Sequence, residues 1–163
     1  MRKPIIAANW KMHKTIAEAI DFVTRLKREA FDLQDVDIVV CPSFTALAEV
    51  SEVLGEANVG LGAQDIFWEE KGAFTGQVAP GQLKDAGCTH AVIGHSERRQ
   101  FFGETNQTVS KKIKAALAIG LTPIVCVGET LQEREGNLTE AVVGKQFKEG
   151  FEGIDLAGFE KVV

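Results

Sequence analysis

The sequence predicts an α/β fold in which short parallel strands alternate with amphipathic helices. The first observation is a series of short, mostly β-branched apolar runs that recurs along the 163 residues. These runs are apolar at both odd and even positions, as expected for strands that are covered on both faces. The second observation is that helical periodicity fills the intervals between them. Regular alternation of the two patterns indicates a parallel sheet rather than separate β and α regions.

Six apolar runs mark the expected strands in chain order. They cover residues 5–8, 37–41, 59–63, 91–94, 123–127 and 161–163. The helical patterns that lie between them include residues 16–30, 46–54 and 109–120. Because the last run has only three residues, we expect about five βα units and the start of a sixth strand.

The first helix has the clearest start signal in the chain. Thr15 and Glu18 fit a capping box, in which each side chain accepts a hydrogen bond from the other residue's backbone N–H. Thr130 and Glu133 repeat this spacing and predict a second such start. The apolar face of the first helix is formed by Ile16, Ile20, Val23, Leu26 and Ala30.

Composition excludes several classes of protein. Hydrophobic residues make up 45% and charged residues 25% of the chain, which is ordinary for a globular domain, so we expect one domain over residues 1–163. The longest nearly apolar stretch, 115–127, is too short to span a bilayer, and the N-terminus shows no secretory signal. A net charge of −5 gives nucleic acid no basic surface to bind.

The cysteines predict neither a metal centre nor a redox motif. Cys41, Cys88 and Cys126 are far apart and odd in number, and no CxxC pair occurs. A reduced, cytoplasmic location is the default expectation for such a chain.

Two layouts are compatible with this order of elements, an open doubly wound sheet and a closed (βα) barrel. The open sheet usually carries a glycine-rich nucleotide loop, but Gly60 and Gly62 form only a GxG, with Asp65 where the third glycine should be. The barrel predicts polar side chains directly after the strands. Such side chains are present at Asn9, Lys11, Ser43, Gln64, Asp65, His95, Glu97 and Glu129.

His95 is the strongest candidate for chemistry, because it follows a strand and precedes Ser96 and Glu97, which suit the first turn of a helix. Partial positive charge at a helix N-terminus disfavours protonation, so a neutral ring would donate an N–H to a carbonyl. Lys11 could hold an anion or balance a developing oxyanion. Each residue also has a simpler interpretation. His95 could hydrogen-bond backbone in a turn, Lys11 could be a solvated lysine, Asn9 a turn residue, and Glu97 an acid favoured at a helix start.

Longer motifs resemble the triosephosphate isomerase family, and the resemblance runs from residue 1 to residue 163 in register. They are Ala8–Met12, Gly62–Asp65, Gly72–Gly76, Ile93–Arg99 and Leu121–Thr130. The resemblance implies an α/β TIM barrel that interconverts dihydroxyacetone phosphate and glyceraldehyde 3-phosphate through an enediolate, with no cofactor and no metal.

The resemblance also implies a role for each matched residue. Asn9 and Lys11 would bind the sugar phosphate, with Lys11 near its anionic atoms. His95 would polarise the carbonyl as a neutral electrophile, and Glu97 would support Lys11. Thr75 would lie near the tip of a loop that inserts into a neighbouring subunit, so a homodimer or larger homo-oligomer is expected.

Part of the family's site has no match among these residues. The family's catalytic glutamate follows the sixth strand, its lid comes next, and its main phosphate loops follow strands seven and eight. Glu152 and Glu160 precede the last apolar run, so neither is assigned as the base. We therefore expect little or no activity from the chain alone; the alternatives are one part of a split isomerase completed by a second chain, or a non-catalytic, self-associating domain.

Overall fold

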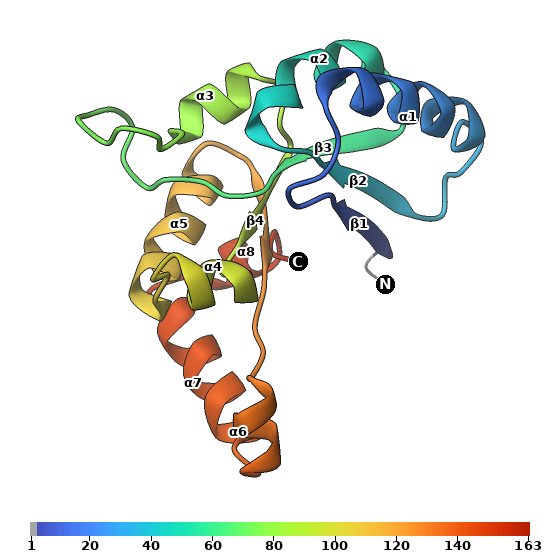
Figure 1. Cartoon of the computed structure of the whole chain (residues 1–163). Coiled ribbons are helices and arrows are strands. Elements are labelled where there is room, and N and C mark those ends of the chain that lie inside the picture. The colour runs from blue at the N-terminus through green and yellow to red at the C-terminus, as the bar shows by residue number, and fades with distance from the viewer. Residues whose placement is uncertain (1–2) are drawn as a thin grey trace.

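The strands form one parallel sheet whose spatial order is the order of the chain. The computed structural model describes residues 3–163, and its five strands are arranged β1-β2-β3-β4-β5. Their bounds are β1 Ile5–Asn9, β2 Asp37–Cys41, β3 Val59–Ala63, β4 His90–Ile93 and β5 Thr122–Val125. All four pairings are parallel, and the sheet is open and curved (Figure 1). The predicted truncated TIM-barrel arrangement is confirmed.

Helices follow every strand and cover the outside of this curve. The helices that precede β4 in the chain are α1 Ile16–Glu29, the short 3-10 helix η1 Phe44–Ala46, α2 Leu47–Leu54 and α3 Pro80–Asp85. Those after it are α4 Ser96–Phe101, α5 Asn106–Ala118, α6 Leu131–Glu135, α7 Thr139–Gly150 and α8 Leu156–Phe159. Helices α1 and α2 pack together beside β3, and α5 packs against β4, β5 and α7 (Figure 1). No helix within residues 3–163 is long and apolar enough to cross a membrane.

Both predicted capping boxes are present. The Thr15 side chain accepts from the Glu18 N–H, and the Glu18 side chain accepts from the Thr15 N–H, at the start of α1. Thr130 and Glu133 do the same for α6. Helix α5 begins three residues before the apolar pattern does, because Thr105 caps it by the same type of contact. Local side-chain chemistry thus sets where these helices begin.

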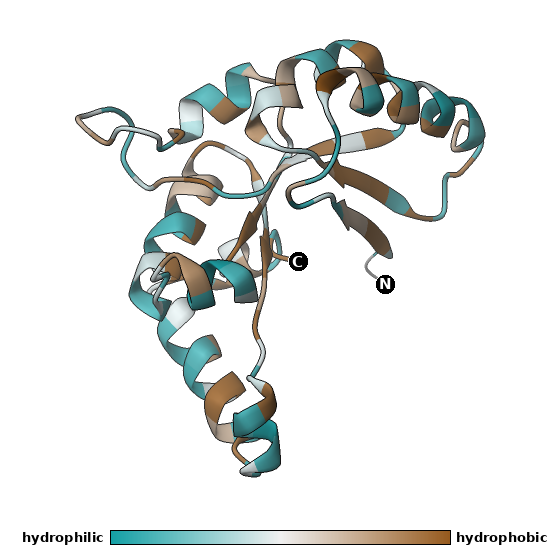
Figure 2. Ribbon diagram, in the orientation of Figure 1, coloured by the Kyte–Doolittle hydropathy of each residue, from teal (hydrophilic) through white to brown (hydrophobic). Residues whose placement is uncertain are grey.

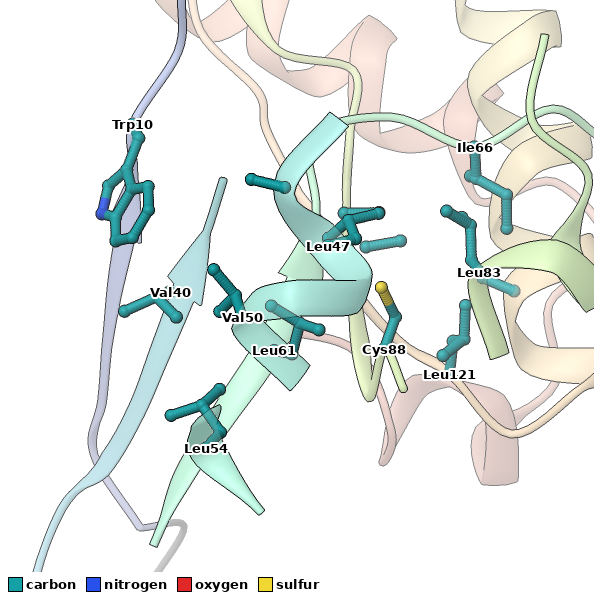
Figure 3. Close-up of a cluster of buried hydrophobic side chains, with 14 of the residues drawn as sticks. Trp10, Val40, Leu47, Val50, Leu54, Leu61, Ile66, Leu83, Cys88 and Leu121 are labelled. Carbon is teal, nitrogen blue, oxygen red and sulfur yellow. The ribbon is translucent and has the colours of Figure 1, made fainter. Parts of the chain in front are cut away.

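The main core lies between the outer face of the sheet and the helices. Figure 2 shows hydrophobic residues along the strands, whereas the helices present both hydrophobic and hydrophilic residues. In Figure 3, Val50 of α2 points toward Val40 and Leu61 of the sheet, and all three are fully buried or nearly so. A second, smaller cluster on the other face of the sheet is centred on Val39, Cys41 and Val92.

The helix-facing side of β1 differs from the expectation that every strand is covered on both sides. Ile6 is 61% exposed, and the strand as a whole is the least buried of the five. Ile6 pairs with Ile38, and Ala8, two residues further on, packs in the main core, so Ile6 lies on the face of the sheet that the helices cover. β1 is an edge strand that pairs only with β2 within residues 3–163, and the helices described there leave Ile6 uncovered.

The last apolar run, residues 161–163, is not a strand, but its end is attached to β5. Val163 N–H donates to the Pro123 carbonyl at 2.9 Å, and Val125 N–H donates to the Val163 carbonyl at 2.7 Å. This pair of bonds is the unit of a parallel ladder. Val163 therefore extends the sheet beyond β5 by one residue, in the direction that the predicted sixth strand would take.

Candidate functional site

Lys11 lies in a loop whose backbone is fixed by its neighbours. Its φ of 52° is in the left-handed region, which is uncommon for a residue other than glycine. The Lys11 N–H donates to Asn9 Oδ1 at 3.0 Å, and Gln64 Nε2 donates to the Lys11 carbonyl at 2.9 Å. The same Gln64 nitrogen also donates to the Cys41 carbonyl at 2.9 Å. Backbone held in this conformation by several contacts is typical of functional sites.

An ion pair with Glu97 holds the Lys11 ammonium in place. Lys11 Nζ lies 2.7 Å from Glu97 Oε1, and both side chains are about half exposed. The hydrogen bond from Lys11 lowers the pKa of Glu97, which keeps that carboxylate ionised well below neutral pH. An exposed pair of this kind contributes little to stability, so its main effect is to fix where the positive charge lies.

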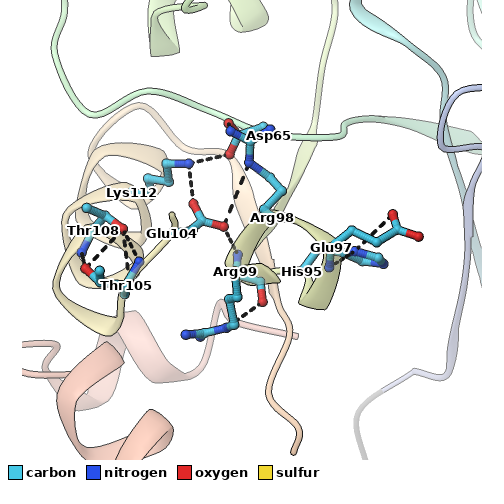
Figure 4. A network of polar contacts seen from close by, with 10 residues as sticks. Asp65, His95, Glu97, Arg98, Arg99, Glu104, Thr105, Thr108 and Lys112 are labelled. Atoms are coloured by element: carbon cyan, nitrogen blue, oxygen red, sulfur yellow. Dashed lines mark hydrogen bonds and ion pairs between the residues drawn. The ribbon is translucent and has the colours of Figure 1, made fainter. Parts of the chain in front are cut away.

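His95 caps the N-terminus of α4 through its ring. Its Nδ1 accepts a hydrogen bond from the Glu97 N–H at 3.2 Å, which leaves the ring proton on Nε2. Gly94, just before it, has a φ of +75°, and a Cβ at that position would lie 3.0 Å from the Cys126 carbonyl oxygen. Close approach and a left-handed turn therefore both require glycine there. Figure 4 shows the His95 ring beside Glu97.

These side chains line one groove of about 570 Å³. Its polar lining includes Asn9, Lys11, Gln64, His95 and Glu97, and its apolar lining includes Met12, Phe44, Phe101 and Phe102. Asp65 and Glu97 supply the carboxylates of this lining, and both are engaged by cations, at 2.6 and 2.8 Å for Asp65 and at 2.7 Å for Glu97. The groove thus presents fixed positive charge and a ring N–H, the donors that stabilise an oxyanion.

Two residues that back this groove, Glu104 and Lys112, were not predicted from the sequence. Lys112 of α5 is 4% exposed and contacts both Asp65 and Glu104, and Arg98 contacts the same two carboxylates from α4. One signal does exist in the sequence, since Lys112 falls on the helical face formed by Val109, Ile113 and Ala116. A lysine on an otherwise apolar face indicates a buried partner.

Comparison with known proteins agrees with this geometry. The model of the family described as triosephosphate isomerase matches residues 4–163. The chain belongs to the triosephosphate isomerase family. Triosephosphate isomerase of Pelobacter propionicus is 55% identical over 163 residues, which is all of this chain and 65% of that protein. Triosephosphate isomerase of Endomicrobium trichonymphae is 53% identical over 156 residues, 96% of this chain and 62% of that protein.

A solved triosephosphate isomerase has the same arrangement in space. The crystal structure of the Bartonella henselae protein is 32% identical, with a TM-score of 0.89 over 99% of this chain and 66% of that one. The chain therefore spans about 65% of the length of the triosephosphate isomerases that it matches.

The structure brings four of the five predicted site residues of a triosephosphate isomerase together. Asn9, Lys11, His95 and Glu97 all line the groove. Thr75 lies apart from them in an exposed loop, beside a turn in which the Gln77 N–H donates to the Phe74 carbonyl at 3.0 Å. The proximity of the first four residues is an observation, whereas the role of each remains a prediction.

Proposed function

We propose that Asn9, Lys11, His95 and Glu97 form the electrophilic, anion-binding part of a triosephosphate isomerase site. The observation that carries this proposal is one chain of contacts. Glu97 accepts from Lys11 Nζ at 2.7 Å with its side chain and donates to His95 Nδ1 at 3.2 Å with its backbone N–H. One residue thereby orients both the ammonium and the ring that would face the substrate.

The chemistry of the isomerisation explains why these groups belong together. A base removes a proton from the carbon next to the carbonyl, and the electron pair moves onto the carbonyl oxygen to form an enediolate. His95 Nε2–H would donate to that oxygen, and the Lys11 ammonium would stabilise its negative charge. Asn9 would contact the sugar phosphate. The resemblance to the family implies that this base is the glutamate after the sixth strand. The two carboxylates in the groove's lining, Asp65 and Glu97, are both paired with cations.

Isomerase assays of the 163-residue chain, alone and with a fragment of a relative added, test this proposal. We expect only trace turnover from the 163-residue chain. Adding the C-terminal part of the Pelobacter propionicus relative that the match leaves uncovered should restore activity in trans, since a base typically supplies about 100- to 10,000-fold.

A His95→Ala chain purified in parallel controls for contaminating host isomerase. If the mixture that contains His95→Ala turns over substrate as fast as the unmodified mixture, the assignment of His95 is contradicted. Binding of the two pieces without any turnover would favour the alternative of a non-catalytic, self-associating domain.

We also propose that two copies associate through the rim of the groove. Met12, Phe101 and Phe102 are 97%, 66% and 69% exposed and lie together around it. Contiguous exposed apolar side chains mark interaction sites, and the loop 65–76, with Thr75 near its tip, is the family's inserting element. A second copy of that loop would cover this rim.

Replacing Phe102 by lysine should therefore convert a dimer, or a larger oligomer, into a monomer at micromolar concentration. Sedimentation velocity measures the change directly. Phe31→Lys is the matched control, because Phe31 is 75% exposed and lies outside the groove. Equal sedimentation of the Phe102→Lys variant and the unmodified chain would refute the rim as an interface.

Cysteine chemistry supports the proposed cytoplasmic setting. All three cysteines are free thiols, as is usual in a reducing compartment. Burial raises the pKa of Cys41 and of Cys88 to about 12, so both remain protonated and unreactive there.

A further inference from the structure

Four charged side chains form a closed ring behind the groove. Lys112 Nζ lies 2.6 Å from Asp65 Oδ1, and Arg98 Nη2 lies 2.8 Å from Asp65 Oδ2. On the opposite side, Lys112 hydrogen-bonds Glu104, and Arg98 Nε makes a longer ion pair of 3.9 Å with Glu104 Oε2. Charges alternate around the ring, which has no net charge. Figure 4 shows Lys112 and Arg98 bridging the two carboxylates.

This ring, Asp65–Lys112–Glu104–Arg98, is too buried to be explained as a surface feature. The side chains of Asp65, Glu104 and Lys112 are 5%, 2% and 5% exposed, and that of Arg98 is 26% exposed. Removing charges from water is costly, and apolar residues of similar size often stabilise a fold as well or better. Stability alone therefore does not explain four charges at this place. A need to hold the segments around them in one defined geometry does.

The ring is connected to the turn that carries His95. Glu104 Oε2 accepts the Gly94 N–H at 3.2 Å, and Arg99 Nε donates to the Gly94 carbonyl at 2.8 Å. The backbone N–H and the carbonyl of Gly94 are thus both hydrogen-bonded to side chains. Arg98 belongs to α4, the helix that His95 caps. The ring therefore contacts the chain on both sides of His95, at Gly94 through Glu104 and in α4 through Arg98.

The ring is also connected to the loop that carries Lys11. Asp65 directly follows Gln64, and Gln64 Nε2 holds the Lys11 carbonyl at 2.9 Å. Movement of Asp65 away from its two cations would move Gln64 and, with it, the Lys11 loop. The two halves of the proposed site are therefore joined through one set of buried charges.

We propose that Asp65, Arg98, Glu104 and Lys112 are positioning residues that set the placement of Lys11 relative to His95. The proposal deepens the proposed function and rests on it. None of the four needs to take part in the proton transfers. The ring fixes the Lys11 loop and the His95 turn to the same set of buried side chains. This placement matters because displacement of a catalytic group by about 1 Å can lower the rate about 100-fold.

Glu104→Gln is the primary test. All three partners of Glu104, which are the Lys112 ammonium, the Gly94 N–H and the Arg98 guanidinium, are donors. The single oxygen of an amide cannot replace the two oxygens of the carboxylate. We expect kcat of the complemented enzyme to fall about 100-fold, with a smaller change in KM. We also expect the ring nitrogens of His95, followed by long-range ¹H–¹⁵N NMR correlation, to lose the distinct Nδ1-acceptor signature.

A double variant separates positioning from stability. Glu104→Gln with Lys112→Met removes one charge of each sign, so the remaining pair of Asp65 and Arg98 is neutral. It should recover stability relative to Glu104→Gln alone without recovering kcat or the His95 signature. Ile113→Val, a buried substitution in the same helix outside the ring, should lower stability and leave both readouts unchanged.

The outcomes distinguish this inference from the proposed function. Unchanged His95 signals and kcat in Glu104→Gln, with lower stability, would show that the ring only stabilises the fold and would overturn the inference. If the unmodified mixture has no turnover, the proposed function fails, and the His95 signals measured on the chain still decide whether the ring positions that residue.

Discussion

His95→Ala is expected to lower turnover of the complemented isomerase by about 100- to 1,000-fold, the usual effect of removing one donor from an oxyanion site. The structure supports a loss of this size because His95 is fixed before substrate arrives. Its Nδ1 is occupied by the Glu97 N–H at 3.2 Å, so Nε2–H is the free donor, and the ring lines the groove. A donor that needs no reorientation stabilises developing charge most effectively.

The matched control is His13→Ala. His13 lines the same groove but is exposed, so turnover of that variant should stay close to that of the unmodified enzyme. Removing His95 also removes a helix cap, worth about 1 kcal/mol, so urea unfolding of each variant should accompany the kinetics. Equal turnover in the two variants would exclude a catalytic role for His95.

Lys112→Met is expected to lower the free energy of unfolding by about 3–5 kcal/mol, the cost of leaving a buried charge without its partner. The variant leaves the carboxylates of Asp65 and Glu104 with only Arg98 between them. A domain of ordinary stability has about 5–15 kcal/mol in total, so a large part of it would be lost. Burial raises the pKa of Asp65, so the loss of stability should shrink in acid, where protonation of Asp65 removes an unpaired negative charge.

Lys111→Met provides the comparison for that substitution. Lys111 is adjacent in the sequence but exposed, and its ammonium lies 5.1 Å from the centre of the Trp68 ring. Its loss should cost about 0.5–1 kcal/mol. Urea unfolding curves at neutral and acidic pH measure both effects, and equal destabilisation by the two variants would mean that burial of Lys112 carries no special cost.

The parts of this fold that sequence could predict are those decided by neighbouring residues. Helix starts at Thr15 and Thr130 follow from a contact across three positions, and the strand at 59–63 lies where its apolar run does. Exposure of Ile6 could not be predicted in this way. It depends on which helices pack over the outer face of β1, and no local pattern carries that information.

The candidate site divides along the same line. Asn9, Lys11, His95 and Glu97 could be selected because each follows a strand and belongs to a longer motif. The ring could not, because Asp65 and Lys112 are 47 positions apart, and a sequence with 18 basic and 23 acidic residues allows very many pairings. Only the packing of α5 against β4 and β5 brings Lys112 to Asp65, which follows β3.

The agreement between spatial order and chain order in the sheet has a consequence for how this protein folds. Every strand from β1 to β5 bonds only to strands next to it in the sequence. Such a topology has low relative contact order for a parallel sheet. Each strand pairing therefore costs little loop-closure entropy before its own contacts stabilise it. Strand–helix units can then be added one after another to a growing edge, and the region that carries Lys11 can fold while the polypeptide that carries His95 is still being synthesised.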